Sequence, residues 1–210
     1  MKYKNILFDL DGTLIDSAPG IEESFFYAYK QIYKIDCPEN IRKLIGPPID
    51  QVLVFINGEK NSSIINKFVE EFKYHYDNAG YKNSLLFDGV LNILEILALT
   101  KNVKTFLVTN KRYEPTKLLL KHFLIEKYFC EICCPDSSKV KFTNKTDLVG
   151  DLLIRQGLRQ NETILIGDTI HDSIAASLNE LDFAFVDYGY GVCDNYQYLL
   201  TDINRLMNVL

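Results

Sequence analysis

Short apolar segments recur along the chain, and most of them end in polar residues or glycine. They cover residues 4–9, 104–109, 131–134, 163–167 and 183–186. Runs of this length are typical of strands that are buried on both faces of a parallel sheet. Stretches of helical spacing lie between them, at 88–100, 115–123, 145–156 and 172–181. Because strands and helices alternate, the pattern predicts an α/β fold, a Rossmann-like parallel sheet with helices on both faces.

Residues 16–80 interrupt this alternation with helical patterns. One begins after Ser17, which is a predicted N-cap, and another covers residues 62–76 and is expected to end at Gly80. Ordinary connections between a strand and a helix have about 2–6 residues, so the segment is too long to be a loop. We therefore expect an inserted α-helical cap domain. The predicted boundaries are 16–80 for the cap, and 1–15 with 81–210 for the catalytic core.

Composition indicates a folded protein and limits its partners. The chain has 210 residues, of which 47% are apolar and 24% charged, as expected for a packed core. Its net charge of −5 is spread along the sequence without a basic block, which argues against nucleic acid as a partner. The apolar runs are too short to span a membrane or to form a signal peptide. We expect a cytoplasmic protein, and the sequence leaves its oligomeric state open.

Three of the five cysteines crowd together as Cys130, Cys133 and Cys134. A structural zinc site needs four ligands, and no second cysteine or histidine pair stands at ligand spacing. The segment has the apolar character of a strand, in which cysteine behaves as a small hydrophobic residue. We therefore interpret this cluster as part of the core.

Two carboxylates follow the first apolar run. Asp9 and Asp11 are two positions apart, so in an extended chain they point to the same face. In open parallel sheets, ligands bind beyond the carboxyl ends of the strands. Two neighbouring carboxylates repel each other, and the pair therefore requires a cation or a shared proton.

A second acidic pair, Asp168 and Asp172, follows the apolar run at 163–167. Carboxylate oxygens are ligands that Mg²⁺ prefers, and Mg²⁺ is commonly held by one or two carboxylates together with substrate phosphate. The two acidic pairs are expected to meet over one magnesium ion.

Polar residues at two further positions complete the candidate site. Thr109 and Asn110 end another strand, where they can donate to a phosphoryl oxygen, although both residue types also form turns. Transfer of a phosphoryl group next to a carboxylate requires a fixed positive charge. Lys145, at the start of a predicted helix, is the leading candidate, and Lys139 and Lys141 compete with it.

These motifs together resemble those of the haloacid dehalogenase-like superfamily, whose members are mostly phosphatases. Asp9-Leu10-Asp11-Gly12-Thr13 is similar to the first motif, Thr109 to the second, Lys145 to the third, and Gly167-Asp168 with Asp172 to the fourth. The inserted segment resembles the helical cap of subclass I. Gly46-Pro47-Pro48, Phe87-Asp88-Gly89 and Tyr188-Gly189-Tyr190-Gly191 resemble the phosphoglycolate phosphatase-like group. The third motif departs from the commoner Lys-Pro form.

The resemblance implies a mechanism with an aspartyl-phosphate intermediate. Asp9 attacks phosphorus, and Asp11 first protonates the leaving group and then activates water. Lys145 is the third catalytic residue. The implied Mg²⁺ ligands are Asp9, Asp168, Asp172 and the backbone carbonyl of Asp11. The implied substrate-binding residues are Gly12, Thr13, Thr109 and Asn110 in the core, with Arg42 and Gly46 in the cap.

The expected substrate is a small phosphorylated metabolite, in particular a phosphoglycolate-like phosphomonoester. A nucleotide or pyrophosphate also fits, and so does phosphomutase chemistry of the β-phosphoglucomutase type. A true dehalogenase lacks the second aspartate, so Asp11 argues against that activity. A non-enzymatic phosphoacceptor module needs neither a large cap nor a general acid, and the sequence has both features.

Overall fold

The computed structural model describes residues 2–38 and 41–210 and divides the chain into two compact units. The first unit combines Met1–Asp16 with Leu86–Leu210, and the second is Ser17–Leu85. The sequence placed the inserted domain at residues 16–80, so the compact unit extends five residues further at its end.

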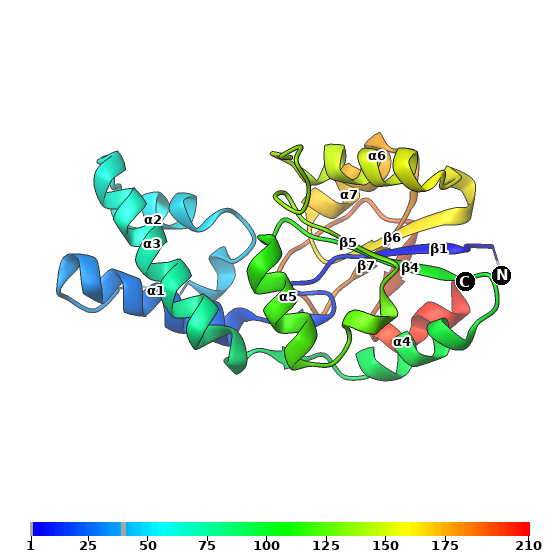
Figure 1. The fold of residues 1–210 in the computed structure, drawn as a ribbon, viewed down its shortest axis with the longest axis horizontal. Coiled ribbons are helices and arrows are strands. Elements are labelled where there is room, and N and C mark those ends of the chain that lie inside the picture. Colours follow the sequence, from blue (N-terminus) through cyan, green and yellow to red (C-terminus); the bar gives the residue numbers. More distant parts are fainter. Residues whose placement is uncertain (1, 39–40) are drawn as a thin grey trace. The chain divides into compact units, whose positions relative to one another are not determined.

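The first unit contains a six-stranded sheet in which every neighbouring pair is parallel. The strand order is β5-β4-β1-β6-β7-β8 (Figure 1). The strands are β1 (Asn5–Phe8), β4 (Lys104–Val108), β5 (Glu131–Cys133), β6 (Thr163–Gly167), β7 (Asp182–Val186) and β8 (Tyr198–Leu200). Because β1 is central, the residues that follow it are flanked by the ends of β4 and β6. The α/β fold with a parallel sheet is therefore confirmed.

Helices cover both faces of this sheet. α6 and α7 lie on one face, and α4 and α5 lie on the other (Figure 1). Their bounds are α4 (Val90–Leu99), α5 (Tyr113–His122), α6 (Lys145–Gln156) and α7 (Ile170–Leu178). Short 3₁₀ helices are Glu126–Tyr128, Gln160–Glu162 and Ile203–Asn208. Leu7, Phe106 and Leu165 from the sheet pack with Leu152 of α6 and Ala176 of α7 in one core cluster, which holds the strand ends in fixed positions.

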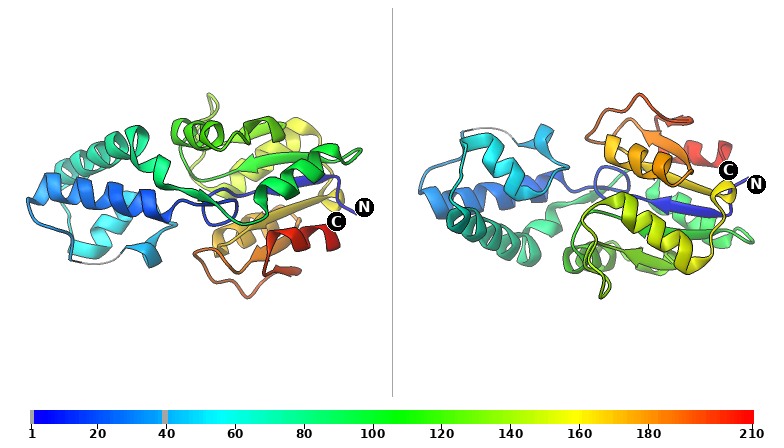
Figure 2. Two further views of the ribbon diagram at one scale, coloured as in Figure 1. Left: turned by 90° about the horizontal axis from the view of Figure 1, so that it is seen from below. Right: turned by 90° about the horizontal axis from the view of Figure 1, so that it is seen from above.

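The second unit has its own helices and core. It consists of α1 (Ala18–Tyr33), α2 (Ile49–Asn57) and α3 (Ser62–Asn78), with 3₁₀ helices at Arg42–Leu44 and Gly80–Asn83 (Figure 2). Phe25 of α1 meets Phe68 of α3 edge to face, with ring centroids 4.9 Å apart. Separately from the six-stranded sheet, β2 (Ile15–Asp16) pairs with β3 (Leu85–Leu86) in a two-stranded sheet.

Of two expectations about helix ends, one was right and one was wrong. Ser17 is the N-cap residue of α1, as predicted, although its side chain makes no capping hydrogen bond there. α3 ends at Asn78, and Gly80 lies beyond it within a 3₁₀ helix. A β-carbon at Gly80 would lie 2.9 Å from the carbonyl oxygen of Gly20. Close packing against α1, rather than helix termination, explains this glycine.

Cys133 and Cys134 lie in the interior, as predicted, whereas Cys130 is exposed because it precedes the start of β5, so the prediction for that residue was wrong. Burial raises the pKa of the Cys133 and Cys134 thiols to about 12, so neither is an activated nucleophile. Within the described ranges, no helix has the length and apolar character needed to cross a membrane.

Candidate active site

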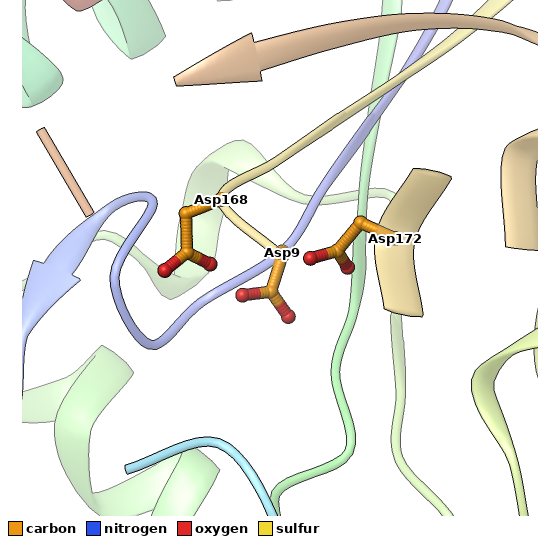
Figure 3. A group of neighbouring side chains, drawn as sticks. All are labelled: Asp9, Asp168 and Asp172. Carbon is orange, nitrogen blue, oxygen red and sulfur yellow. The ribbon is translucent and has the colours of Figure 1, made fainter. Parts of the chain in front are cut away.

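Three buried carboxylates converge at the carboxyl ends of β1 and β6 (Figure 3). Asp9 follows β1 directly, Asp168 follows β6, and Asp172 lies in the first turn of α7. One oxygen from each carboxylate lies within 4.8 Å of the other two. This carboxylate trio brings together three of the residues predicted from the two acidic pairs.

Backbone geometry makes this convergence possible. β1 and β6 are in register with Phe8 opposite Ile166, and the Asp9 N–H donates to the Ile166 carbonyl at 2.9 Å. Gly12 turns the chain after β1 with a φ of +86°. A β-carbon there would lie 2.1 Å from Oδ2 of Asp168. The site therefore requires glycine at position 12 for both conformation and space.

Hydrogen bonds from neighbouring loops orient two members of the trio. Oδ2 of Asp168 accepts from the backbone N–H of Tyr190 at 2.8 Å, and the Thr13 hydroxyl approaches Oδ1 at 3.5 Å. Oδ2 of Asp172 accepts from both the N–H and the hydroxyl of Thr169, at 3.0 and 2.6 Å, in a capping box. Both bonds to Asp172 use its Oδ2, so its Oδ1 is available to a further partner.

Lys145 supplies that partner. Its ammonium donates to Oδ1 of Asp9 and to Oδ1 of Asp172. The residue is 5% exposed, whereas Lys139 and Lys141 are exposed. The geometry thus favours Lys145 over both competing lysines as the fixed positive charge.

The electrostatics of the trio show an excess of negative charge. Burial raises the pKa of Asp9 well above its usual range, and the carboxylates of Asp172 and Asp168 add to this effect against the opposing pull of Lys145. Burial, with repulsion from Asp172, raises the pKa of Asp168 to about 7. Burial by itself lowers the pKa of Lys145, but Asp172 and Asp9 outweigh that effect and leave it raised. One ammonium does not balance three buried carboxylates.

This donor set fits a magnesium ion. All three groups are hard oxygen ligands, and they lie close enough together to share one cation. A divalent cation would favour the ionised forms of Asp9 and Asp168 and so oppose the burial and the mutual repulsion that raise their pKa values. Asp9, Asp168 and Asp172 are therefore the residues that would hold it.

Asp11 has a different environment from the trio. Both of its carboxylate oxygens lie 3.1 Å from the ammonium of Lys111. Sequence reasoning missed Lys111, although it stands two residues after Thr109, at the end of the strand beside β1. That position after β4 was the available signal, and the contact itself depends on the register of β1 and β4.

Thr109 and Asn110 differ in their exposure. Thr109 is buried, and its Oγ1 accepts from the backbone N–H of Lys111 at 3.1 Å. Asn110 is exposed. The hydroxyl oxygen of Thr109 thus stabilises the turn after β4, and its hydrogen can still be donated to a phosphoryl oxygen. The turn-forming and phosphate-binding interpretations of Thr109 are therefore compatible.

The two predicted substrate-binding residues of the cap belong to the second unit. Arg42 lies 3.7 Å from Oε2 of Glu22, measured from its Nη1, and is about half exposed. Gly46 has a φ of +136° and open space around its α-carbon. Their part in substrate binding stays a prediction.

The sequence profile of the haloacid dehalogenase-like hydrolases matches residues 6–186. The chain belongs to this family. The match spans both strands that carry the trio, together with Lys111 and Lys145, and the enzyme class predicted from the four motifs is confirmed.

Members of this family with high similarity include phosphatases. A 5′-nucleotidase from Pseudomonas aeruginosa is 31% identical over 196 residues, which cover 91% of this chain and 86% of that protein. A phosphoglycolate phosphatase from Nitrosospira multiformis is 26% identical over 90% of this chain and 86% of its own. A haloacid dehalogenase-like hydrolase from Streptococcus pneumoniae has the same fold, with a TM-score of 0.87 and 24% identity over 99% of this chain and 98% of its own.

Proposed function

We propose that the protein is a magnesium-dependent phosphatase that hydrolyses a small phosphorylated metabolite, a phosphoglycolate-like phosphomonoester, through a phosphorylated Asp9. The observation that supports this most strongly is the separation of two charge clusters. Asp9 lies in the trio with Lys145, whereas Asp11 is paired with Lys111. The two aspartates are thus held by different partners, which allows them different roles in one reaction.

Asp9 acts as the nucleophile in this scheme. Its carboxylate attacks phosphorus and forms an acyl phosphate, which replaces one difficult displacement by two easier ones. Asp11 donates a proton to the leaving oxygen in the first step. As the resulting carboxylate, it takes a proton from the attacking water in the second.

Lys145 and the Thr109 hydroxyl stabilise the non-bridging phosphoryl oxygens, together with backbone N–H groups that follow Asp9. The N–H groups of Gly12 and Thr13 instead donate within the turn, to the carbonyls of Ile15 and Leu10. Magnesium bound to Asp9, Asp168 and Asp172 would neutralise charge on the phosphoryl group and on the nucleophile. The backbone carbonyl of Asp11 stays a predicted fourth ligand. The cytoplasmic location suggested by the sequence also stays a prediction.

Hydrolysis of p-nitrophenyl phosphate tests the proposal. The protein, first treated with EDTA, should release many equivalents of p-nitrophenol per chain when Mg²⁺ is added and almost none without it. Asp9→Asn should abolish turnover, because the amide keeps the shape and loses the nucleophile. Asp187→Asn is the matched control, since Asp187 follows β7 at the same edge of the sheet and is exposed. Release of a single equivalent by the wild type would instead indicate a phosphoacceptor module.

A nucleotidase is the second candidate, and the identity of 31% to a 5′-nucleotidase favours it. The same catalytic groups serve both substrates, so only the leaving group differs. Initial rates on 2-phosphoglycolate, nucleoside 5′-monophosphates and pyrophosphate decide between them. Product analysis with a hexose phosphate distinguishes hydrolysis from mutase chemistry.

A further inference from the structure

Lys111 makes a two-point contact with Asp11. Its Nζ lies 3.1 Å from both carboxylate oxygens, and both side chains are mostly shielded, with 10% of the lysine and 21% of the aspartate exposed. A contact to both oxygens restrains the position of the carboxylate group relative to the turn after β4. Charge-assisted hydrogen bonds are also stronger than neutral ones, and this partial shielding reduces competition from water.

The backbone places this lysine accurately. β1 and β4 are neighbours in register, with Phe8 opposite Leu107, so the turns after the two strands lie side by side. The turn after β4 is held by the hydrogen bond from the Lys111 N–H to Thr109 Oγ1. Lys111 thus starts from a fixed backbone position beside Asp11, rather than from a long mobile loop.

The two lysines of the site, one after β4 and one at the start of α6, have separate partners. Lys145 contacts Asp9 and Asp172, while Lys111 contacts Asp11. A general acid acts only when it lies within about 2.6–3.2 Å of the oxygen that it protonates. The side chain of an aspartate in a turn can rotate about its bonds. Its carboxyl group then spends only part of the time in the reactive geometry, unless a neighbouring group restricts it.

We propose that Lys111 is a positioning residue, which holds the carboxyl group of Asp11 in the place needed for proton transfer to the leaving oxygen and from the attacking water. This inference rests on the proposed function, because it assigns Asp11 the acid role. Lys111 acts through Asp11 and need not contact the phosphoryl group. In the first step, which kcat/KM reports, its loss should therefore affect only those leaving groups that require the proton of Asp11.

Two aryl phosphates of similar shape test this. The phenolate of p-nitrophenyl phosphate leaves with little protonation, whereas that of phenyl phosphate needs the acid. For Lys111→Met, kcat/KM on phenyl phosphate should fall at least about tenfold more than on p-nitrophenyl phosphate, within the roughly 10²–10⁴-fold range of general acid catalysis. Asp11→Asn should show the same selectivity, and Lys111→Arg should recover part of the loss. Lys121→Met, an exposed lysine of α5, is the control and should behave as wild type.

The double variant Lys111→Met with Asp11→Asn separates positioning from direct contact. If Lys111 acts through Asp11, the double variant is no slower than Asp11→Asn on either ester. Equal losses of Lys111→Met on both esters, or a further loss in the double variant, would overturn the proposal. A wild-type protein that hydrolyses neither ester with Mg²⁺ would instead refute the proposed function itself.

Discussion

Lys145 places a buried positive charge between the carboxylates of Asp9 and Asp172. Lys145→Met should lower kcat on p-nitrophenyl phosphate by about 10²-fold or more, because it removes a preorganised charge from the transition state. It also leaves buried carboxylates without their partner, which costs about 3–5 kcal/mol of folding stability. Thermal melting with and without Mg²⁺ should show a destabilised protein that the cation partly rescues.

Lys139→Met and Lys141→Met are the controls for this prediction, because both lysines are exposed and precede Lys145 closely in the chain. Both variants should keep near-normal rates and melting temperatures. A crippling loss from either of them, with Lys145→Met nearly active, would mean that the third motif has been assigned to the wrong lysine.

The four aspartates were predictable because each stands at or just after the end of an apolar run, and such ends share one edge in a parallel sheet. Lys111 was not predictable in this way. Its contact with Asp11 needs β4 to be adjacent to β1, and a side chain long enough to reach across. Neither condition leaves a local pattern in the sequence.

At the scale of elements, the tight turn between β1 and β2 controls the site. Gly12→Ala places a β-carbon against Asp168 and forces a left-handed conformation that costs about 1–2 kcal/mol in a residue with a side chain. We expect a lower melting temperature and a weakened thermal shift on adding Mg²⁺, because Asp168 is displaced.

Gly157→Ala is the matched control for Gly12→Ala. Gly157 has a similar φ of +61°, at the C-terminal end of α6, with nothing within 4 Å of an added β-carbon. It should lose stability through its backbone alone and keep the full Mg²⁺ response. If the two variants responded equally to Mg²⁺, the close approach of Gly12 to Asp168 would be irrelevant to the metal site.

Elements with a clear pattern between distinct boundary residues were the easiest to predict. α6 begins and ends at the predicted residues, 145 and 156, and β6 matches its predicted range as well. β8 (Tyr198–Leu200) was missed because three residues at the edge of a sheet give too short a pattern. α2 (Ile49–Asn57) was missed because it follows Pro47 and Pro48, and prolines usually signal the end of a helix, although proline is well tolerated at a helix start.

At the scale of the whole molecule, the chemistry and the choice of substrate are expected to divide between the two units. The trio, both site lysines and Asp11 belong to the first unit, whereas Arg42 and Gly46 belong to Ser17–Leu85. Arg42→Ala should therefore lower kcat/KM on the preferred metabolite and leave p-nitrophenyl phosphate nearly unaffected, since a small activated ester needs little specific recognition.

Lys73→Ala is the control for Arg42→Ala, because Lys73 is an exposed cation on α3 of the same unit. It should change neither rate. Equal losses on both substrates from Arg42→Ala would place Arg42 in the catalytic machinery and end the proposed division between the units.

The central claim is that Asp9 becomes phosphorylated and that Asp11 is needed to hydrolyse the product. Asp11→Asn tests it directly with p-nitrophenyl phosphate, because this leaving group departs without an acid whereas the attack of water still requires a base. We expect a rapid burst of one equivalent of p-nitrophenol per chain, followed by slow turnover. Borohydride added during the slow phase should convert position 9 to homoserine, as read by peptide mass spectrometry. Turnover without a burst, with Asp9 unmodified in the same sample, would contradict the account.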